Sequence, residues 1–214
     1  PSTTVTLARY ISPTDTPATK HIFTGRADWT INQAQSLTFG YQLGRSNDLR
    51  AFSGTNRIAD SLIGRIRNTD AYNVTHNYVI SPRIVNQFRF QYSTLRPSSA
   101  QDAGALSAAV LVTFTGPTGQ GGTQVFGSST NSSDRAEDRW QFTDTVSFVT
   151  GNHTFRFGGD FQRIDTTFTD RFDATGTYTF SNFAFFSQNS VSRYQQNFNT
   201  TSELRNNYIG VFGQ

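Results

Sequence analysis

The chain has 214 residues, of which 35% are hydrophobic and 15% are charged, and its mean hydropathy is −0.48. No stretch approaches the roughly 18 consecutive apolar residues of a membrane helix, so a helical membrane protein is excluded. A transmembrane β-barrel is not excluded, because its strands alternate lipid-facing and lumen-facing residues and keep the average hydropathy low. The net charge is +3, but the arginines are dispersed singly, which argues against nucleic-acid binding.

An alternating segment over residues 3–11 predicts a first strand, and a hairpin follows it. In IFTGRADWTINQAQSLTFGYQL, apolar residues occupy odd positions over residues 23–31 and again over residues 37–43, on either side of a turn at 32–36. The positions between them are mostly polar. This period of two predicts paired strands with one apolar and one polar face.

Two more hairpins repeat this arrangement further along the chain. In YNVTHNYVISPRIVNQFRFQY, apolar residues lie mainly at even positions on both sides of a turn at residues 81–83. In RWQFTDTVSFVTGNHTFRFGGDFQR, a two-residue turn at 151–152 pairs Phe142 with Phe161. Asp144 is an exception on this apolar face, and we expect it near a strand end or beside a glycine. A last strand is predicted over residues 205–214.

The predicted strands number about eight and are about 9 to 12 residues long, which is the length that a tilted strand needs to cross a bilayer. Soluble strands average about 5 to 6 residues. Tight turns at one end alternate with long loops at the other. The sequence therefore predicts an all-β, antiparallel, up-and-down transmembrane β-barrel segment with short periplasmic turns and long external loops. The long loops are expected at about 45–69, 95–137 and 165–204.

Aromatic residues near the strand ends support this prediction, because tyrosine and tryptophan gather at membrane interfaces. The residues expected in these girdles are Trp29, Tyr72, Tyr78, Tyr92 and Trp140. The competing interpretation is a soluble two-sheet β-sandwich, in which the phenylalanine faces would turn inward.

Several segments resemble one family. GNHTFRFGGDFQR resembles the G-x-H-x-(aromatic/Leu)-(Lys/Arg)-F-G-G-(Asp/Glu)-Phe hairpin of TonB-dependent outer-membrane receptors, in particular the Oar-like group, which carries an N-terminal carboxypeptidase-regulatory-like module. SPRIVNQFRFQYS is similar to that group's S-P-x-(hydrophobic)-(hydrophobic)-N-(Glu/Gln)-(hydrophobic)-R strand, and NYIGVFGQ to the start of its Y-x-(Gly)-x-(Phe)-x-Q strand. GTYTFSN matches a loop segment that follows the first motif. The resemblance implies a piece of a barrel of about 22 strands.

We therefore expect residues 1–214 to form one partial barrel domain truncated at both ends, with no plug and no signal peptide. The chain begins at Pro1, and its last residues stop inside an alternating run. The resemblance implies a Gram-negative outer-membrane transporter or receptor that takes up a scarce or bulky substrate of siderophore, glycan or peptide type. Its partners would be outer-membrane lipid and, through other parts of the parent chain, a plug domain and the TonB complex. Two alternatives stay open: a self-contained eight-stranded outer-membrane adhesin or structural barrel, and a soluble carbohydrate-binding β-sandwich.

Two sets of side chains are candidates for contact with a solute. Charged residues of the polar faces are expected to line the lumen, and the aromatic, amide-rich loop after residue 175 is expected to contact a ligand, or else to pack on itself. The lumen set is Arg26, Asp28, Arg89, Arg156, Asp160 and Arg163. The loop set is Tyr178, Phe180, Phe183, Phe185, Phe186 and Tyr194.

Catalysis and metal binding are not expected. The histidines His21, His76 and His153 are dispersed along the chain, and cysteine is absent, so neither a catalytic triad nor a His/Cys metal site is predicted. The acidic loop segments SSDRAEDRW and DTTFTDRFD have the composition of a Ca²⁺ loop, but each also contains an arginine that can neutralise it. We expect no enzyme activity and no cofactor.

Overall fold

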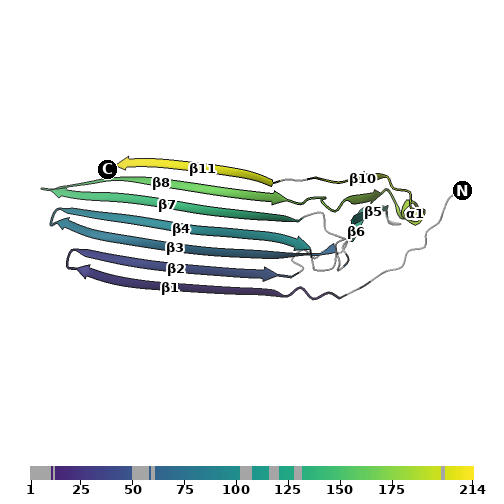
Figure 1. The fold of residues 1–214 in the computed structure, drawn as a ribbon, viewed down its shortest axis with the longest axis horizontal. Coiled ribbons are helices and arrows are strands. Elements are labelled where there is room, and N and C mark those ends of the chain that lie inside the picture. The colour runs from purple at the N-terminus through teal and green to yellow at the C-terminus, as the bar shows by residue number, and fades with distance from the viewer. Residues whose placement is uncertain are drawn as a thin grey trace.

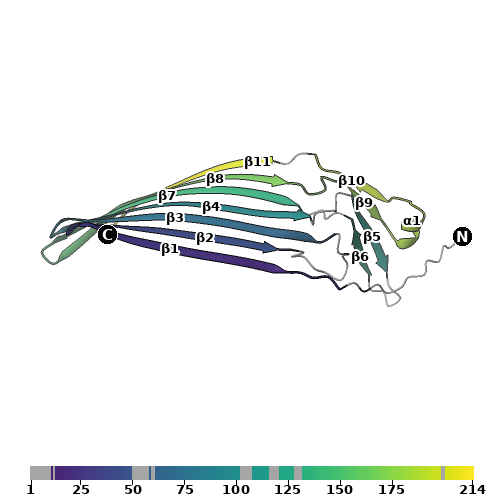
Figure 2. The same cartoon turned by 60° about the horizontal axis from the view of Figure 1, so that its bottom comes forward.

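The computed structural model describes residues 11, 13–49, 58, 61–101, 108–115, 121–127, 132–198 and 201–214. Long antiparallel strands form one curved seven-stranded sheet in the order β1-β2-β3-β4-β7-β8-β11 (Figure 1, Figure 2). This confirms the all-β prediction with long antiparallel strands. The strands are β1 (Ala18–Asn32), β2 (Gln35–Asp48), β3 (Ile63–Ser81), β4 (Ile84–Gln101), β7 (Ser133–Thr150), β8 (His153–Asp170) and β11 (Thr201–Gly213).

The tight turns lie where the sequence predicts them. They fall at residues 33–34, 82–83 and 151–152, and all three occupy the same end of the sheet (Figure 1). In the third turn Gly151 has a φ of 60°, in the left-handed region that side chains disfavour, so a glycine suits this position. The long connections lie at the opposite end, which we call the long-loop end.

The strands are longer than predicted, with 13 to 19 residues each. The additional residues lie at the long-loop end, where β3 stays paired with β4 as far as Ile63 and Gln101. Polar side chains hold this part of the sheet together, as where the Ser98 hydroxyl donates to the Asp134 carboxylate across β4 and β7. The sequence prediction ended each strand where its apolar residues end, and it therefore missed the polar extension.

The described part of the sheet does not close into a barrel. β1 and β11 are the two edges of the sheet and pair with β2 and β8 alone. A self-contained barrel would require its first and last strands to pair. The strand predicted over residues 3–11 lies outside the described residues except for Ile11, which belongs to no strand. The predicted total of about eight strands therefore stays a prediction.

Two of the long loops combine into a second, smaller sheet at the long-loop end (Figure 1, Figure 2). Its order is β10-β9-β5-β6, and β5 runs parallel to β9, which ties together segments from two different loops. The sequence prediction placed no strands in these loops. This unit, which we call the cap, comprises β5 (Ala109–Thr115), β6 (Gly121–Phe126), β9 (Thr177–Phe180), β10 (Arg193–Gln195) and the short helix α1 (Phe183–Ser187). No helix in the described part of the chain is long and apolar enough to cross a membrane.

The most deeply buried apolar side chains of the described residues lie in the cap or where β3 begins, at the long-loop end. They are Leu62, Ile63, Val112, Val125 and Phe180. Phe180 meets Phe186 of α1 edge-on at 5.2 Å between ring centroids, and Phe186 in turn stacks on Phe126 of β6 at 6.0 Å. The cap therefore has a small hydrophobic core of its own.

We predict that Phe180→Ala loosens the cap and leaves the long sheet intact. Removing a buried phenylalanine side chain costs about 3 to 5 kcal/mol, and Phe180 is 4% exposed. Limited proteolysis of the full-length protein measures the effect as faster cleavage within residues 102–131 and 171–200. The matched control is Phe185→Ala, since Phe185 is 41% exposed. Equal cleavage rates for the two variants would show that the cap does not depend on this core.

Candidate functional site: the two faces of the sheet

One face of the long sheet is a continuous aromatic and aliphatic surface, which we call the aromatic face. The predicted pair Phe142 and Phe161 is confirmed, and Phe90 lies on the other side of Phe142. Ring centroids are 5.1 Å apart for Phe90 and Phe142 and 6.3 Å apart for Phe142 and Phe161. No second sheet of the described residues covers this face, and Trp29 is 58% exposed on it. A β-sandwich would bury these rings in a core, so the structure does not support that alternative.

A row of aromatic rings crosses the aromatic face. Tyr41, Tyr72, Tyr92 and Trp140 are register partners on β2, β3, β4 and β7, with successive ring centroids 4.8, 6.3 and 4.3 Å apart. From this row to the tight-turn end, residues 72–80, 84–92 and 140–148 each give about nine residues, enough for a tilted strand to cross a bilayer. The row lies in the middle of the strands and not at the long-loop ends where the sequence placed it, because the strands extend further.

The three nine-residue stretches lie side by side and form a strip across the aromatic face, which we call the membrane band. Aromatic residues also lie at its other limit, near the tight turns. Trp29 pairs with Leu37 and Tyr78 pairs with Gln35, close to the tight turns, as the sequence predicts. Aromatic residues therefore lie at both ends of a band whose length matches the hydrocarbon region of a bilayer.

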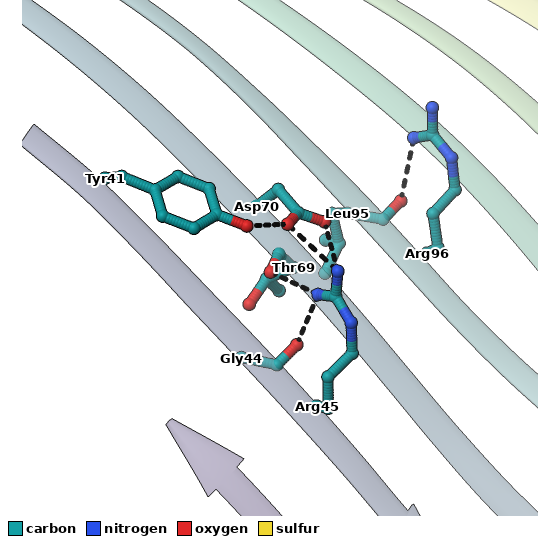
Figure 3. A network of polar contacts seen from close by, with 7 residues as sticks. All are labelled: Tyr41, Gly44, Arg45, Thr69, Asp70, Leu95 and Arg96. Carbon is teal, nitrogen blue, oxygen red and sulfur yellow. Dashed lines mark hydrogen bonds and ion pairs between the residues drawn. The ribbon is translucent and has the colours of Figure 1, made fainter. Parts of the chain in front are cut away.

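Directly beyond the ring row, the same face becomes ionic (Figure 3). The Tyr41 hydroxyl donates to Asp70 Oδ1 at 2.8 Å, and Arg45 Nη2 donates to both carboxylate oxygens of Asp70 at 2.9 Å. Arg45 Nη1 also donates to the backbone carbonyls of Gly44 at 2.9 Å and Thr69 at 2.7 Å. One guanidinium thus joins β2 to β3 through a side chain and a backbone acceptor.

The same arrangement recurs one hairpin further on. The Tyr92 hydroxyl donates to Asp138 Oδ1 at 2.7 Å, and Arg96 Nη2 donates to both Asp138 oxygens at 2.7 and 2.8 Å. Arg96 Nη1 donates to the carbonyls of Leu95 and Glu137. Arg96 and the Leu95 carbonyl stand beside the first network in Figure 3. The protein therefore carries two copies of one Tyr–Asp–Arg network on the aromatic face.

Sequence reasoning missed this network, although a signal exists. Tyrosine and arginine are four positions apart on one strand, in YQLGR and YSTLR, and so share a face. The aspartate comes from the next strand, opposite the residue two positions after the tyrosine: Asp70 faces Leu43 and Asp138 faces Thr94. The triad is visible in the sequence only once the strand register is known.

The opposite side of the long sheet, which we call the polar face, carries five of the six predicted lumen residues. Arg26 pairs with Asp28 at 2.9 Å, and Asp160 accepts hydrogen bonds from Gln141 at 2.8 Å and from Thr143 at 2.6 Å. The two remaining members lie on β4 and β8. Arg89 is the register partner of Thr75 and Thr143, and Arg156 stands 6.0 Å from the Phe212 ring centroid.

The sixth residue, Arg163, was placed on the wrong face. It is the register partner of Trp140 and therefore lies on the aromatic face, level with the ring row. There its Nε donates to Asp165 at 2.8 Å, and Arg205 donates to the same carboxylate at 2.8 Å. Asp144, the exception on this face, lies opposite Gly159 as expected and accepts a hydrogen bond from Asn86 Nδ2 at 2.6 Å.

The loop residues proposed to contact a ligand divide into two groups. Phe180 is buried in the cap core, so its prediction as a ligand contact is wrong. Tyr178 and Tyr194 pair across β9 and β10 with ring centroids 4.7 Å apart, and they are 38% and 49% exposed. Phe185 and Phe186 are also partly exposed, whereas Phe183 is less so. Both predicted behaviours, self-packing and exposure, therefore occur within the one loop.

The titratable residues form no metal centre in the described ranges. His21, His76 and His153 lie on β1, β3 and β8. No group of three or more His, Cys, Asp or Glu residues could hold a metal ion within the part of the chain that the structure describes. The two acidic segments predicted as loops lie mostly in β7 and β8, so that prediction is wrong. There Asp134 pairs with Arg171 and Asp165 pairs with Arg163.

We predict that Arg45→Gln lowers the unfolding temperature of the purified full-length protein more than Arg26→Gln does. Arg45 links two strands, whereas Arg26 bonds an aspartate two residues away on its own strand. The Arg45 pair is also less solvent-exposed, at 37% and 20% for the two side chains against 68% and 57%. Heat-dependent mobility on gels measures both midpoints. Equal shifts would show that the network does not stabilise the strand pairing.

Comparisons with known proteins agree with this geometry. A family model described as "Outer membrane beta barrel domain" matches residues 1–214. Among solved structures, the outer membrane transporter YddB from Escherichia coli is similar, with a TM-score of 0.59 and 10% sequence identity over 92% of this chain. The chain spans 27% of that transporter's length, and at this identity the similarity shows the fold alone. A search of curated proteins found no match. The chain therefore belongs to the outer membrane beta-barrel domain family and is a component of the bacterial outer membrane.

Proposed function

We propose that the chain is a wall segment of a TonB-dependent outer-membrane transporter or receptor that takes up a scarce or bulky substrate. The observation that carries this proposal is the separation of the two faces: an uncovered aromatic band of membrane length on one side and a charged, hydrogen-bonded surface on the other. Transmembrane β-barrels alternate lipid-facing apolar and lumen-facing polar residues, so the charged side of the sheet would line the lumen through which a solute passes.

The open edges of the sheet fit the same proposal. Within the described residues, β1 and β11 present unpaired strand edges, which must be paired or covered for the sheet to persist in a membrane. The similar transporter is several times longer than the matched region, since 92% of this chain covers 27% of it. Strands elsewhere in the parent protein would complete the barrel, and a plug domain would fill its lumen and connect it to the TonB complex.

Two surfaces of the chain would meet the substrate. In the lumen these are the charged residues of the polar face, Arg26, Asp28, Arg89, Arg156 and Asp160, which offer both donors and acceptors to a plug or a polar solute. Outside the membrane it is the exposed part of the cap, where Tyr178, Tyr194 and Phe185 present rings to solvent. Exposed aromatic rings beside amide side chains suit sugars, peptides and chelates.

The test is substrate uptake by the intact parent protein. Cells with and without its gene are grown on a panel of ferric chelates, glycans and peptides as limiting nutrients, each in a background with and without TonB. We expect at least one nutrient to support growth only when both the gene and TonB are present, because energised transport requires the two together. Growth that needs the gene but not TonB would overturn the proposal, and so would surface adhesion conferred by the gene without any uptake.

A further inference from the structure

A hollow of about 440 Å³ lies on the polar face of β1, β2 and β3, towards the long-loop end. Its lining includes Lys20, Ser46, Asp48, Arg65 and Arg67. None of these residues belongs to the lumen set described above. Arg45, whose guanidinium is bound to Asp70 in the first Tyr–Asp–Arg network, also borders the hollow.

The hollow exists because small residues follow one another along the middle strand. Gly44 and Ser46 lie on β2 between longer side chains of β1 and β3. A Cβ atom on Gly44 would lie 2.5 Å from Thr69 Oγ1, which is closer than side chains tolerate. The glycine therefore leaves the base of the hollow unfilled. Lys20 and Arg67 are the two register partners of Ser46. Two long cationic side chains therefore flank one short hydroxyl side chain.

The charges of these two cations are not neutralised by neighbours. Neither Lys20 nor Arg67 forms an ion pair or a side-chain hydrogen bond with any residue in the described ranges. This sets them apart from Arg26, whose guanidinium is bound to a carboxylate. Among the described lining residues, Asp48 is the one acidic residue. It lies opposite Arg65 in the register and accepts a hydrogen bond from the Ser46 hydroxyl at 3.4 Å. The hollow thus carries an excess of positive charge.

We propose that this hollow binds the anionic oxygen group, a carboxylate or phosphate, of a solute that enters the lumen from the outside. Arginine binds such groups through a planar fork of donors, and lysine binds them through a point charge. The site is at the long-loop end of the polar face, where a solute would arrive first. This inference rests on the proposed transport function and deepens it, because it assigns a negative charge to the substrate.

The experiment titrates inorganic phosphate into the purified full-length protein at constant ionic strength and follows binding by calorimetry. We expect Arg67→Gln and Lys20→Gln each to weaken phosphate binding about tenfold, since each removes a charge-assisted hydrogen bond. The matched control is Arg139→Gln, which removes the same charge from the same face outside the hollow, at a residue that belongs to no proposed substrate surface. Its affinity should stay within about twofold of the wild type. Gel mobility before and after heating verifies that all variants are folded.

Three results would overturn the proposal. One is that the wild-type protein binds phosphate no better than the Lys20→Gln/Arg67→Gln double variant. Another is that all three single variants lose affinity for phosphate equally. That result would indicate non-specific attraction by the charge of the whole surface and not binding at one site. The third comes from an arm with detergent micelles containing phosphatidylglycerol: micelles that displace phosphate would assign the site to a lipid headgroup. Because the titration uses no energised membrane, its outcome is independent of whether TonB-dependent uptake is found.

Discussion

The structure depends on the two-residue period of the β-strand, which sends successive side chains to opposite faces of the sheet. A slip of one residue in any pairing would exchange the faces of that strand and place Arg or Asp among the phenylalanines. Each of the long strands keeps the same parity across its neighbours, so that Phe90, Phe142 and Phe161 form one row and Gln91, Gln141 and Gln162 form the adjacent row on the other face. The aromatic face, the polar face and the hollow all follow from this shared register.

Where the membrane band ends is decided by a second interaction, the Tyr–Asp–Arg network. Tyrosine can lie at the membrane interface because its ring is apolar and its hydroxyl is polar. In this protein the hydroxyls of Tyr41 and Tyr92 donate to carboxylates in the next polar layer, and each carboxylate is held by an arginine. Those arginines are neutralised, so the layer adds hydrogen bonds without adding net charge. Lys20 and Arg67 of the hollow differ, because neither forms an ion pair with a carboxylate of the described residues.

Much of the long sheet could be predicted from the sequence, because its local signals agree with one another. The alternation of apolar and polar residues predicts which side chains share a face of the sheet. The turn residues predict the register of the hairpins, including the pair Phe142 and Phe161. Two features could not be read in this way. The polar strand extensions have no apolar alternation, and the cap pairs β5 with β9 from loops far apart in sequence, so no local signal joins them. The prediction for Arg163 is wrong for a related reason: it assigns a charged residue to the lumen, whereas strand parity places Arg163 beside Trp140 at the edge of the membrane band.

We expect the aromatic face to contact lipid and the polar face to contact water. The most direct test is a spin-label scan along residues 140–148 of β7 in the full-length protein reconstituted in a bilayer. The chain has no cysteine, so single cysteines introduced here label uniquely once any in the rest of the parent protein are removed. We predict that labels at even positions collide more with oxygen, which partitions into lipid, and that labels at odd positions collide more with a water-soluble nickel complex. Accessibility without a two-residue period, or with the opposite phase, would contradict this assignment of the faces.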